Sequence, residues 1–87
     1  MDFTFKPNGV CSREISLRLN GYTIEDCSFT GGCSGNTQGI AALIKGTDAR
    51  EMIPRLKGIR CGFKKTSCPD QLALALEEAL KQQKKNA

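Results

Sequence analysis

Residues 14–19 alternate between polar and apolar side chains and run directly into Asn20-Gly21. The alternation predicts a strand with one buried face, and Asn-Gly is the strongest short-range signal for a tight hairpin turn. The return strand is predicted over residues 22–29, where the apolar positions change face, and a β-bulge near Glu25-Asp26 reconciles the two faces. The first third of the chain is therefore committed to an antiparallel sheet.

The flanking segments predict one more strand and three helices. Residues 2–7 alternate weakly and end at Pro-Asn-Gly, which favours an edge strand followed by a turn. Helical spacing follows in three segments: residues 34–45, a segment that opens on the capping box from Asp48 to Glu51 and stops at Gly58, and residues 69–84. The apolar residues expected to face the core are Ile40, Leu43, Ile44, Met52, Ile53, Leu56, Leu72, Leu76 and Leu80. We expect an α+β fold, a two-layer domain in which a three-stranded antiparallel sheet is covered on one face by about three helices.

The length of 87 residues suits one domain, residues 1–87, with a basic tail at 81–87. No run of about 18 apolar residues predicts a transmembrane helix, and the N-terminus lacks the basic start and apolar core of a signal peptide. We therefore expect a cytoplasmic protein with no membrane contact. Much of the net charge of +4 lies in tail lysines, and the chain has one Tyr, no Trp and no RNA-binding motif, so nucleic acid is not an expected partner.

The chain has five cysteines and no histidine. In a reducing compartment, cysteines are more often metal ligands or reactive thiols than disulfides. Without histidine, a Ser-His-Asp triad, a histidine general base and a mixed Cys/His zinc site are excluded. The chemistry of the chain must therefore use thiolates, carboxylates, amines or backbone groups.

Four cysteines stand at the ends of predicted elements, and the fifth stands inside a strand. The four are Cys11, Cys33, Cys61 and Cys68. Unpaired N–H groups and the dipole at a helix start favour a thiolate, and two of the four open predicted helices. We therefore expect the four to converge as metal ligands, although they include no Cys-x2-Cys pair and their spacing alone is a weak metal signal. Cys27 lies inside the return strand and is expected to be a small buried hydrophobe.

Basic residues stand close to three of these cysteines in the sequence, and they are Arg13, Arg60, Lys64 and Lys65. Four thiolates around a divalent metal carry a formal charge of about −2, which is costly unless neighbours offset it. The same residues are equally consistent with a solvated basic face.

Residues 66–70 read Thr-Ser-Cys-Pro-Asp, and with them the chain resembles the TSCPD domain family. The likeness extends over Cys11-Ser12, residues 29–33, residues 35–40, residues 56–62 and residues 70–73, and it covers the chain from about Phe3 to Leu80. TSCPD domains also occur appended to ribonucleotide reductases, including adenosylcobalamin-dependent ones. The resemblance therefore implies a small stand-alone member that serves deoxyribonucleotide synthesis, with a ribonucleotide reductase or another redox protein as its partner. Ribonucleotide reduction itself needs a barrel around a radical cofactor, which is far more chain than 87 residues, so stand-alone catalysis is not expected.

The order of cysteines and helices is also similar to that of NifU/IscU-type iron–sulfur scaffold proteins. In those proteins three cysteines at one end of a small α+β domain hold zinc or a nascent cluster, and Cys11, Cys33 and Cys68 correspond to them by order. This chain has Arg13 where the scaffolds carry an aspartate, and it offers Cys61 as a fourth thiolate. The difference favours a closed four-cysteine site, with zinc as first choice and an iron–sulfur cluster as second.

Two other functions stay open. Cys61 and Cys68 would be the exchanging pair if the chain were a thiol redox partner of a ribonucleoside-diphosphate reductase, with Cys68 as the attacking thiol. Residues 31–35, Gly-Gly-Cys-Ser-Gly at a helix start, would cradle a phosphate if the chain were a nucleotide-binding subunit of such a system, although the glycine pattern is no Walker or dinucleotide fingerprint. The sequence does not choose between zinc and iron, identify the partner or decide whether the domain forms a homodimer.

Overall fold

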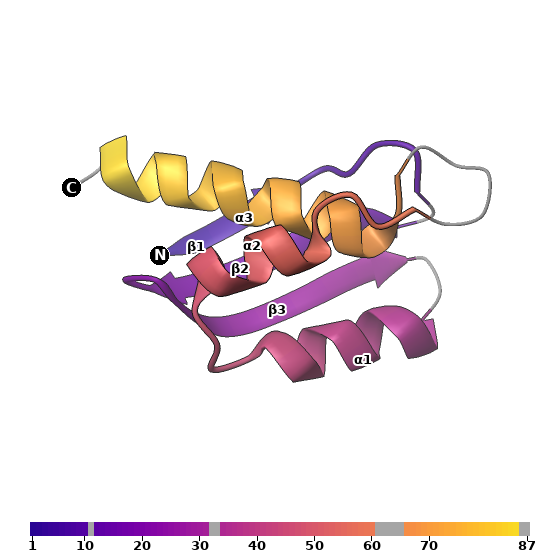
Figure 1. Ribbon diagram of the computed structural model, residues 1–87, viewed down its shortest axis with the longest axis horizontal. Coiled ribbons are helices and arrows are strands. Elements are labelled where there is room, and N and C mark those ends of the chain that lie inside the picture. Colours follow the sequence, from indigo (N-terminus) through magenta and orange to yellow (C-terminus); the bar gives the residue numbers. More distant parts are fainter. Residues whose placement is uncertain (11, 32–33, 61–65, 86–87) are drawn as a thin grey trace.

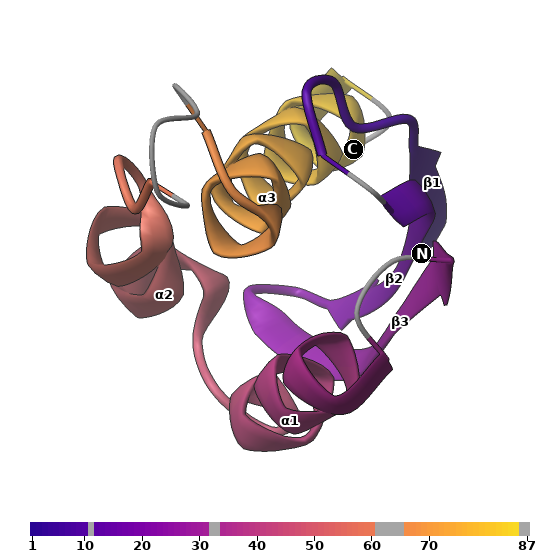
Figure 2. The same ribbon diagram turned by 90° about the vertical axis from the view of Figure 1, so that its right-hand side faces the viewer.

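The computed structural model describes residues 1–10, 12–31, 34–60 and 66–85. Within them, strands β1 (Asp2–Phe5), β2 (Ser12–Asn20) and β3 (Thr23–Gly31) precede helices α1 (Ser34–Ile44), α2 (Ala49–Leu56) and α3 (Cys68–Lys85). The strands form one antiparallel sheet in the order β1-β2-β3. Helix α1 packs against β3, α3 packs against β2 and β1, and α2 packs against α3, with all three helices on the same side of the sheet (Figures 1 and 2). The predicted α+β class and the three-stranded sheet are confirmed.

The predicted hairpin forms, but its turn lies one residue later than expected. Asn20 pairs with Thr23, so the two-residue turn is Gly21-Tyr22 and β3 begins at Thr23. Gly21 has a φ of 62°, as in a type II′ turn, where glycine takes the first central position. The turn therefore depends on the glycine of the Asn-Gly pair and not on the asparagine.

The β-bulge predicted near Glu25-Asp26 is confirmed. The pairing register between β2 and β3 shifts at Glu25, which is the extra residue on β3. Side chains of a regular strand alternate between the two faces, so Ile24 and Cys27 would face opposite sides without the bulge. With it, both side chains lie in the core, 0% and 4% exposed.

The core side of α3 is close to the prediction. Leu72 and Leu76 are fully buried, whereas Leu80 is only partly buried against the same core. Four further residues predicted to face inward are also partly buried there, and they are Ile40, Met52, Ile53 and Leu56. The predicted N-cap of α2 is confirmed as well, since the Asp48 carboxylate accepts a hydrogen bond of 2.8 Å from the backbone N–H of Arg50.

The prediction for Leu43 in α1 is wrong, because its side chain is 79% exposed. The buried stripe of α1 consists of Thr37, Ala41 and Ile44, which are spaced by four and three residues as one helical face requires. Packing against β3 fixes the rotation of α1, and that rotation presents two small residues and one isoleucine to the sheet. The prediction followed the large apolar side chains and therefore placed Leu43 on the buried face.

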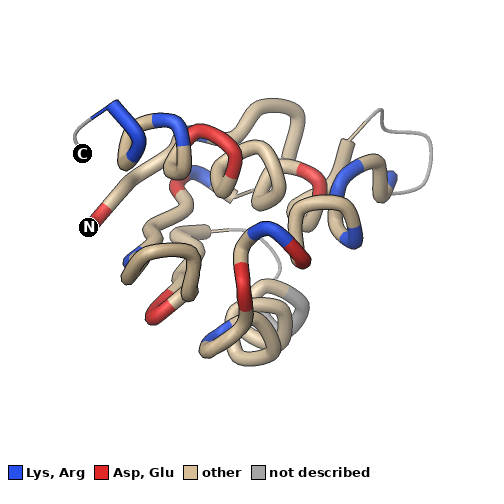
Figure 3. The backbone as a smooth tube through the Cα atoms, turned by 60° about the vertical axis from the view of Figure 1, so that its left-hand side comes forward, with Lys and Arg blue, Asp and Glu red and all other residues tan. Residues whose placement is uncertain are grey.

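The basic residues near the C-terminus belong to α3, which continues to Lys85. Figure 3 shows this cluster at the C-terminal end of the helix, where the dipole favours cations. No helix among the residues that the structure describes is long and apolar enough to span a membrane.

Candidate metal site at the start of α3

Cys68 is the predicted ligand that the structure describes, whereas Cys11, Cys33 and Cys61 lie outside the described residues. Cys68 lies at the start of α3, as predicted, although the helix begins on Cys68 itself and not at residue 69, and the residue is half-buried. Within the described ranges, no three Cys, Asp or Glu side chains lie together as a metal-binding group. The four-cysteine set therefore stays a prediction.

Cys27 is set apart from this region, as the sequence predicted. Its side chain is part of the hydrophobic core. Burial, together with the neighbouring Asp26 carboxylate, raises the pKa of Cys27 to about 12. A thiol that stays protonated is a poor ligand and a poor nucleophile, so Cys27 acts as a core hydrophobe.

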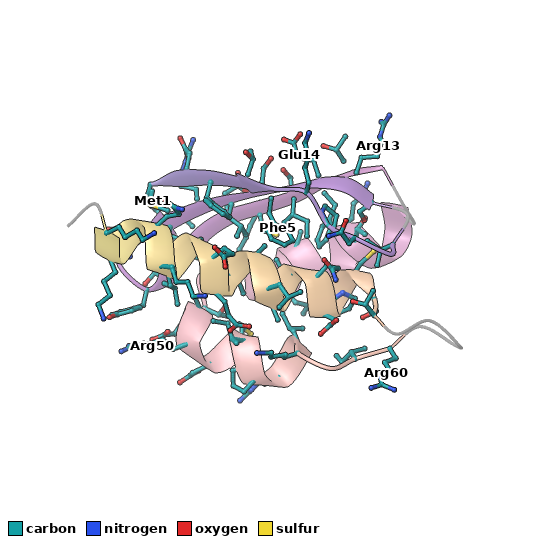
Figure 4. The ribbon with its side chains drawn as sticks, turned by 90° about the horizontal axis from the view of Figure 1, so that it is seen from above. Met1, Phe5, Arg13, Glu14, Arg50 and Arg60 are labelled. Atoms are coloured by element: carbon teal, nitrogen blue, oxygen red, sulfur yellow. The ribbon has the colours of Figure 1, made fainter. Side chains whose placement is uncertain are left out.

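Ser12, at the start of β2, lies beside Cys68. The distance from Ser12 Oγ to Cys68 Sγ is 3.1 Å, and the Ser12 side chain is 3% exposed. A second register shift in the sheet, at Arg13, makes this contact possible. In a regular strand Arg13 would share the buried face with Ile15, but the shift turns Ser12 inward instead. Arg13 projects from the open face of the sheet (Figure 4).

The cations predicted to offset the charge of a metal site are not directed toward Cys68 where the structure describes them. Arg13 and Arg60 are both exposed and point outward in Figure 4. Lys64 and Lys65 lie outside the described residues. Arg13 and Arg60 therefore fit the alternative interpretation, in which the basic residues form a solvated face.

The start of α3 is tied to the segment that follows α2. Ser67 is the N-cap: its Oγ accepts a hydrogen bond of 3.2 Å from the Asp70 N–H and donates one of 2.5 Å to the Ile59 carbonyl. The Asp70 carboxylate accepts a hydrogen bond of 2.7 Å from the Gly58 N–H and another from the Thr66 hydroxyl. Two neighbouring backbone groups, the Gly58 N–H and the Ile59 carbonyl, are thus held against the first turn of α3.

Gln71 ties the same helix start to the turn between β1 and β2. Its Oε1 accepts a hydrogen bond of 3.1 Å from the Asn8 N–H, and its Nε2 donates one of 2.9 Å to the Thr66 hydroxyl. The Thr66 methyl group lies 3.1 Å from where a Cβ on Gly9 would be, and Gly9 has a φ of 72°. Only glycine combines this φ with so close an approach at low cost.

These contacts bring the described neighbours of all four predicted ligands to one end of the molecule, which we call the Cys68 end. Ser12 follows Cys11 in the sequence, contacts Cys68 and pairs with Gly31 at the end of β3. Figures 1 and 2 show the start of β2, the end of β3 and the starts of α1 and α3 together at this end. Ile59, two residues before Cys61, is held there by Ser67.

The sequence reasoning missed Ser12, Gln71 and the links made by Asp70. The sequence did contain a signal for Gln71. It stands four positions before Ala75, on the buried side of α3, and it is 6% exposed. A polar side chain on a buried face needs a partner. No pattern in the sequence marks the register shift at Arg13 that turns Ser12 inward.

We expect Asp70→Asn to lower the free energy of unfolding at pH 7 by about 1–2 kcal/mol, because two hydrogen bonds to a charged, partly exposed acceptor are weakened. The Thr66 hydroxyl and the Gly58 amide hold the pKa of Asp70 below its ordinary value. The ionised carboxylate therefore stabilises the fold fully above about pH 4, the pKa of an unfolded aspartate, and this contribution is lost as the pH falls through the lower folded value. Urea unfolding at falling pH from about pH 7, over the range in which both proteins still unfold cooperatively, should show a flatter acid limb in the variant.

Asp2→Asn is the control for this prediction. Asp2 pairs with Arg18 at 2.9 Å, but its side chain is 77% exposed, and exposed pairs contribute little. An Asp70→Asn protein as stable as Asp2→Asn at pH 7 would show that the hydrogen bond to Gly58 does not stabilise the fold.

Searches of curated proteins and of solved structures each give no match. The similarity to NifU/IscU scaffolds accordingly gains no support and stays a prediction. The family model of the TSCPD domain matches residues 3–80. This match covers almost all of the sheet and the helical layer, including the Ser12–Cys68 contact, and the chain therefore belongs to the TSCPD domain family.

Proposed function

We propose that this protein is a small cytoplasmic metal-binding module whose ligands are the thiolates of Cys11, Cys33, Cys61 and Cys68. Zinc is the first choice of metal and an iron–sulfur cluster the second. The observation that carries the proposal is the convergence of the described neighbours of all four cysteines at the Cys68 end. Cys11, Cys33 and Cys61 each stand within two residues of Ser12, Gly31 or Ile59 in the sequence, and a chain advances at most about 3.8 Å per residue.

The donor set suits such a metal. Cys68 is half-buried, with its Sγ beside the buried hydroxyl of Ser12. The chain has no histidine, so cysteine sulfur replaces the histidine nitrogen of mixed zinc sites. Four thiolates form a closed tetrahedral zinc site or hold an iron–sulfur cluster. Bound zinc would supply folding energy, and a bound cluster would supply electron transfer.

The surrounding residues would hold the ligands in place. Ser67 and Asp70 fix the first turn of α3, and with it Cys68, against Gly58 and Ile59. Gln71 holds the turn that contains Asn8 against the same helix. Two segments, residues 58–59 and the turn that contains Asn8, are thus held by hydrogen bonds from one short stretch, residues 66–71. A site built from distant cysteines requires such links.

TSCPD domains also occur appended to ribonucleotide reductases. This association supports an accessory role in deoxyribonucleotide synthesis, with a ribonucleotide reductase or another redox protein as the partner. The alternatives, a thiol redox partner that uses Cys61 and Cys68 and a nucleotide-binding subunit that uses residues 31–35, remain predictions from the sequence. Stand-alone catalysis is not part of the proposal.

Metal analysis of anaerobically purified protein tests the proposal. We expect about one zinc, or one cluster, per chain, with four thiols that react with a thiol reagent only after the metal is removed. An absorption spectrum taken under argon separates the two metals, because iron–sulfur clusters absorb visible light and zinc does not. Cys68→Ser should lose most of the metal.

Cys27→Ala is the matched control and should keep the metal, because Cys27 belongs to the hydrophobic core and is not a predicted ligand. Less than stoichiometric metal together with four freely titrating thiols would overturn the proposal. Formation of a Cys61–Cys68 disulfide on mild oxidation of such metal-free protein would favour the redox alternative.

A further inference from the structure

The buried hydroxyl of Ser12 contacts a sulfur atom from a distant part of the chain. Ser12 Oγ and Cys68 Sγ are 3.1 Å apart, across a sequence separation of 56 residues. The side chain of Ser12 is 3% exposed, so water does not easily replace this partner. A buried hydroxyl without a partner would cost about 1–3 kcal/mol. The contact with Cys68 Sγ avoids this cost, so the fold depends on the two side chains facing each other.

The direction of this hydrogen bond depends on the state of Cys68. A serine hydroxyl can donate or accept, and so can a thiol, but a thiolate can only accept. A metal-bound cysteine is deprotonated. In the metal-bound protein, Ser12 must therefore be the donor and Cys68 Sγ the acceptor.

A neutral hydrogen-bond donor at this position would partly offset the negative charge of a four-thiolate site. Such a site with a divalent metal carries a formal charge of about −2, and the described arginines beside the cysteines, Arg13 and Arg60, point outward. The Ser12 hydroxyl is aimed at the sulfur instead. Hydrogen bonds to ligand sulfurs are among the factors that tune a metal site.

We propose that Ser12 is the positioning residue of the metal site: it orients Cys68 Sγ and, by donating a hydrogen bond, reduces the negative charge on that ligand. This inference rests on the proposed function and assigns a role to a residue that is not a ligand. The register shift at Arg13 places Ser12 for this role, because without the shift Ser12 would lie on the open face of the sheet with Ser16.

The test compares zinc affinity and the spectrum of the cobalt-substituted full chain. Ser12→Ala should bind zinc about 10–100-fold more weakly in competition with a chromophoric chelator, the effect typical of losing an outer-shell partner. Its sulfur-to-cobalt charge-transfer band should shift to lower energy, because the thiolate loses a donor. Ser12→Thr keeps the hydroxyl and should restore both values, and Ser16→Ala should leave both unchanged.

A second pair of variants covers the case in which Ser12→Ala does not fold. Ser12→Thr and Ser12→Val have nearly the same shape and differ by one hydroxyl, so a difference in charge-transfer energy between them reports the hydrogen bond and not packing. If wild type binds cobalt through sulfur and the Ala, Val and Thr variants all match it, the role of Ser12 is wrong while the metal site stands. If wild type binds neither zinc nor cobalt, the proposed function itself fails.

Discussion

Protein stripped of the proposed metal under reducing conditions is expected to lose the cooperative unfolding transition that the zinc-loaded protein should show. Structural zinc contributes about 10–16 kcal/mol of apparent binding free energy at pH 7, whereas the net stability of a domain is about 5–15 kcal/mol. The apolar core is small: among the residues that the structure describes, the largest fully buried side chains are Ile15, Leu19, Ile24, Leu72 and Leu76. Thermal unfolding followed by circular dichroism, with and without a chelator, measures the difference, and added zinc should restore the transition.

The hydrogen bonds at the start of α3 are not expected to replace the metal. Ser67, Asp70 and Gln71 hold three segments together, but each such bond contributes only about 1 kcal/mol net. Cys27→Ala, treated in the same way, controls for damage to the buried free thiol. A chelated protein with an unchanged melting temperature would show that the core and these hydrogen bonds suffice, and that any bound metal is not structural.

The fold could be predicted from the sequence where a local pattern determines it. The alternation before Asn20 marks β2, and the change of face among the apolar residues of β3 marks the bulge at Glu25, which was confirmed. Leu43 was misplaced because no local pattern sets the rotation of a helix whose inward residues are small. That rotation is a tertiary property, fixed by packing against β3.

The site could be predicted only as a set of cysteines at element ends. Cys68 opens α3 as expected, and Cys27 is separate from it in the core. The groups that hold this region together act over long separations: Asn8 to Gln71 spans 63 residues, and Ser12 to Cys68 spans 56. Sequence periodicity reports neighbours within one element, so it carries no information on such pairs.

Leu76→Ala is expected to lower the free energy of unfolding, measured with zinc present, by about 2–5 kcal/mol, which is a large part of the stability of a small domain. Leu76 is 0% exposed and lies in α3, the helix that packs against both the sheet and α2. Its removal therefore leaves a cavity between the two layers, which rigid neighbours fill only in part. Urea unfolding in the presence of zinc measures the loss.

Leu43→Ala makes the same substitution at a position where no cavity can form, because the side chain is 79% exposed. The expected change is within about 0.5 kcal/mol, and alanine is also a slightly better helix former than leucine. The pair separates the two faces of the helical layer, since size and chemistry are held constant and only burial differs. A comparable loss in both variants would mean that Leu43 is covered in solution and that α1 does not present this face to water.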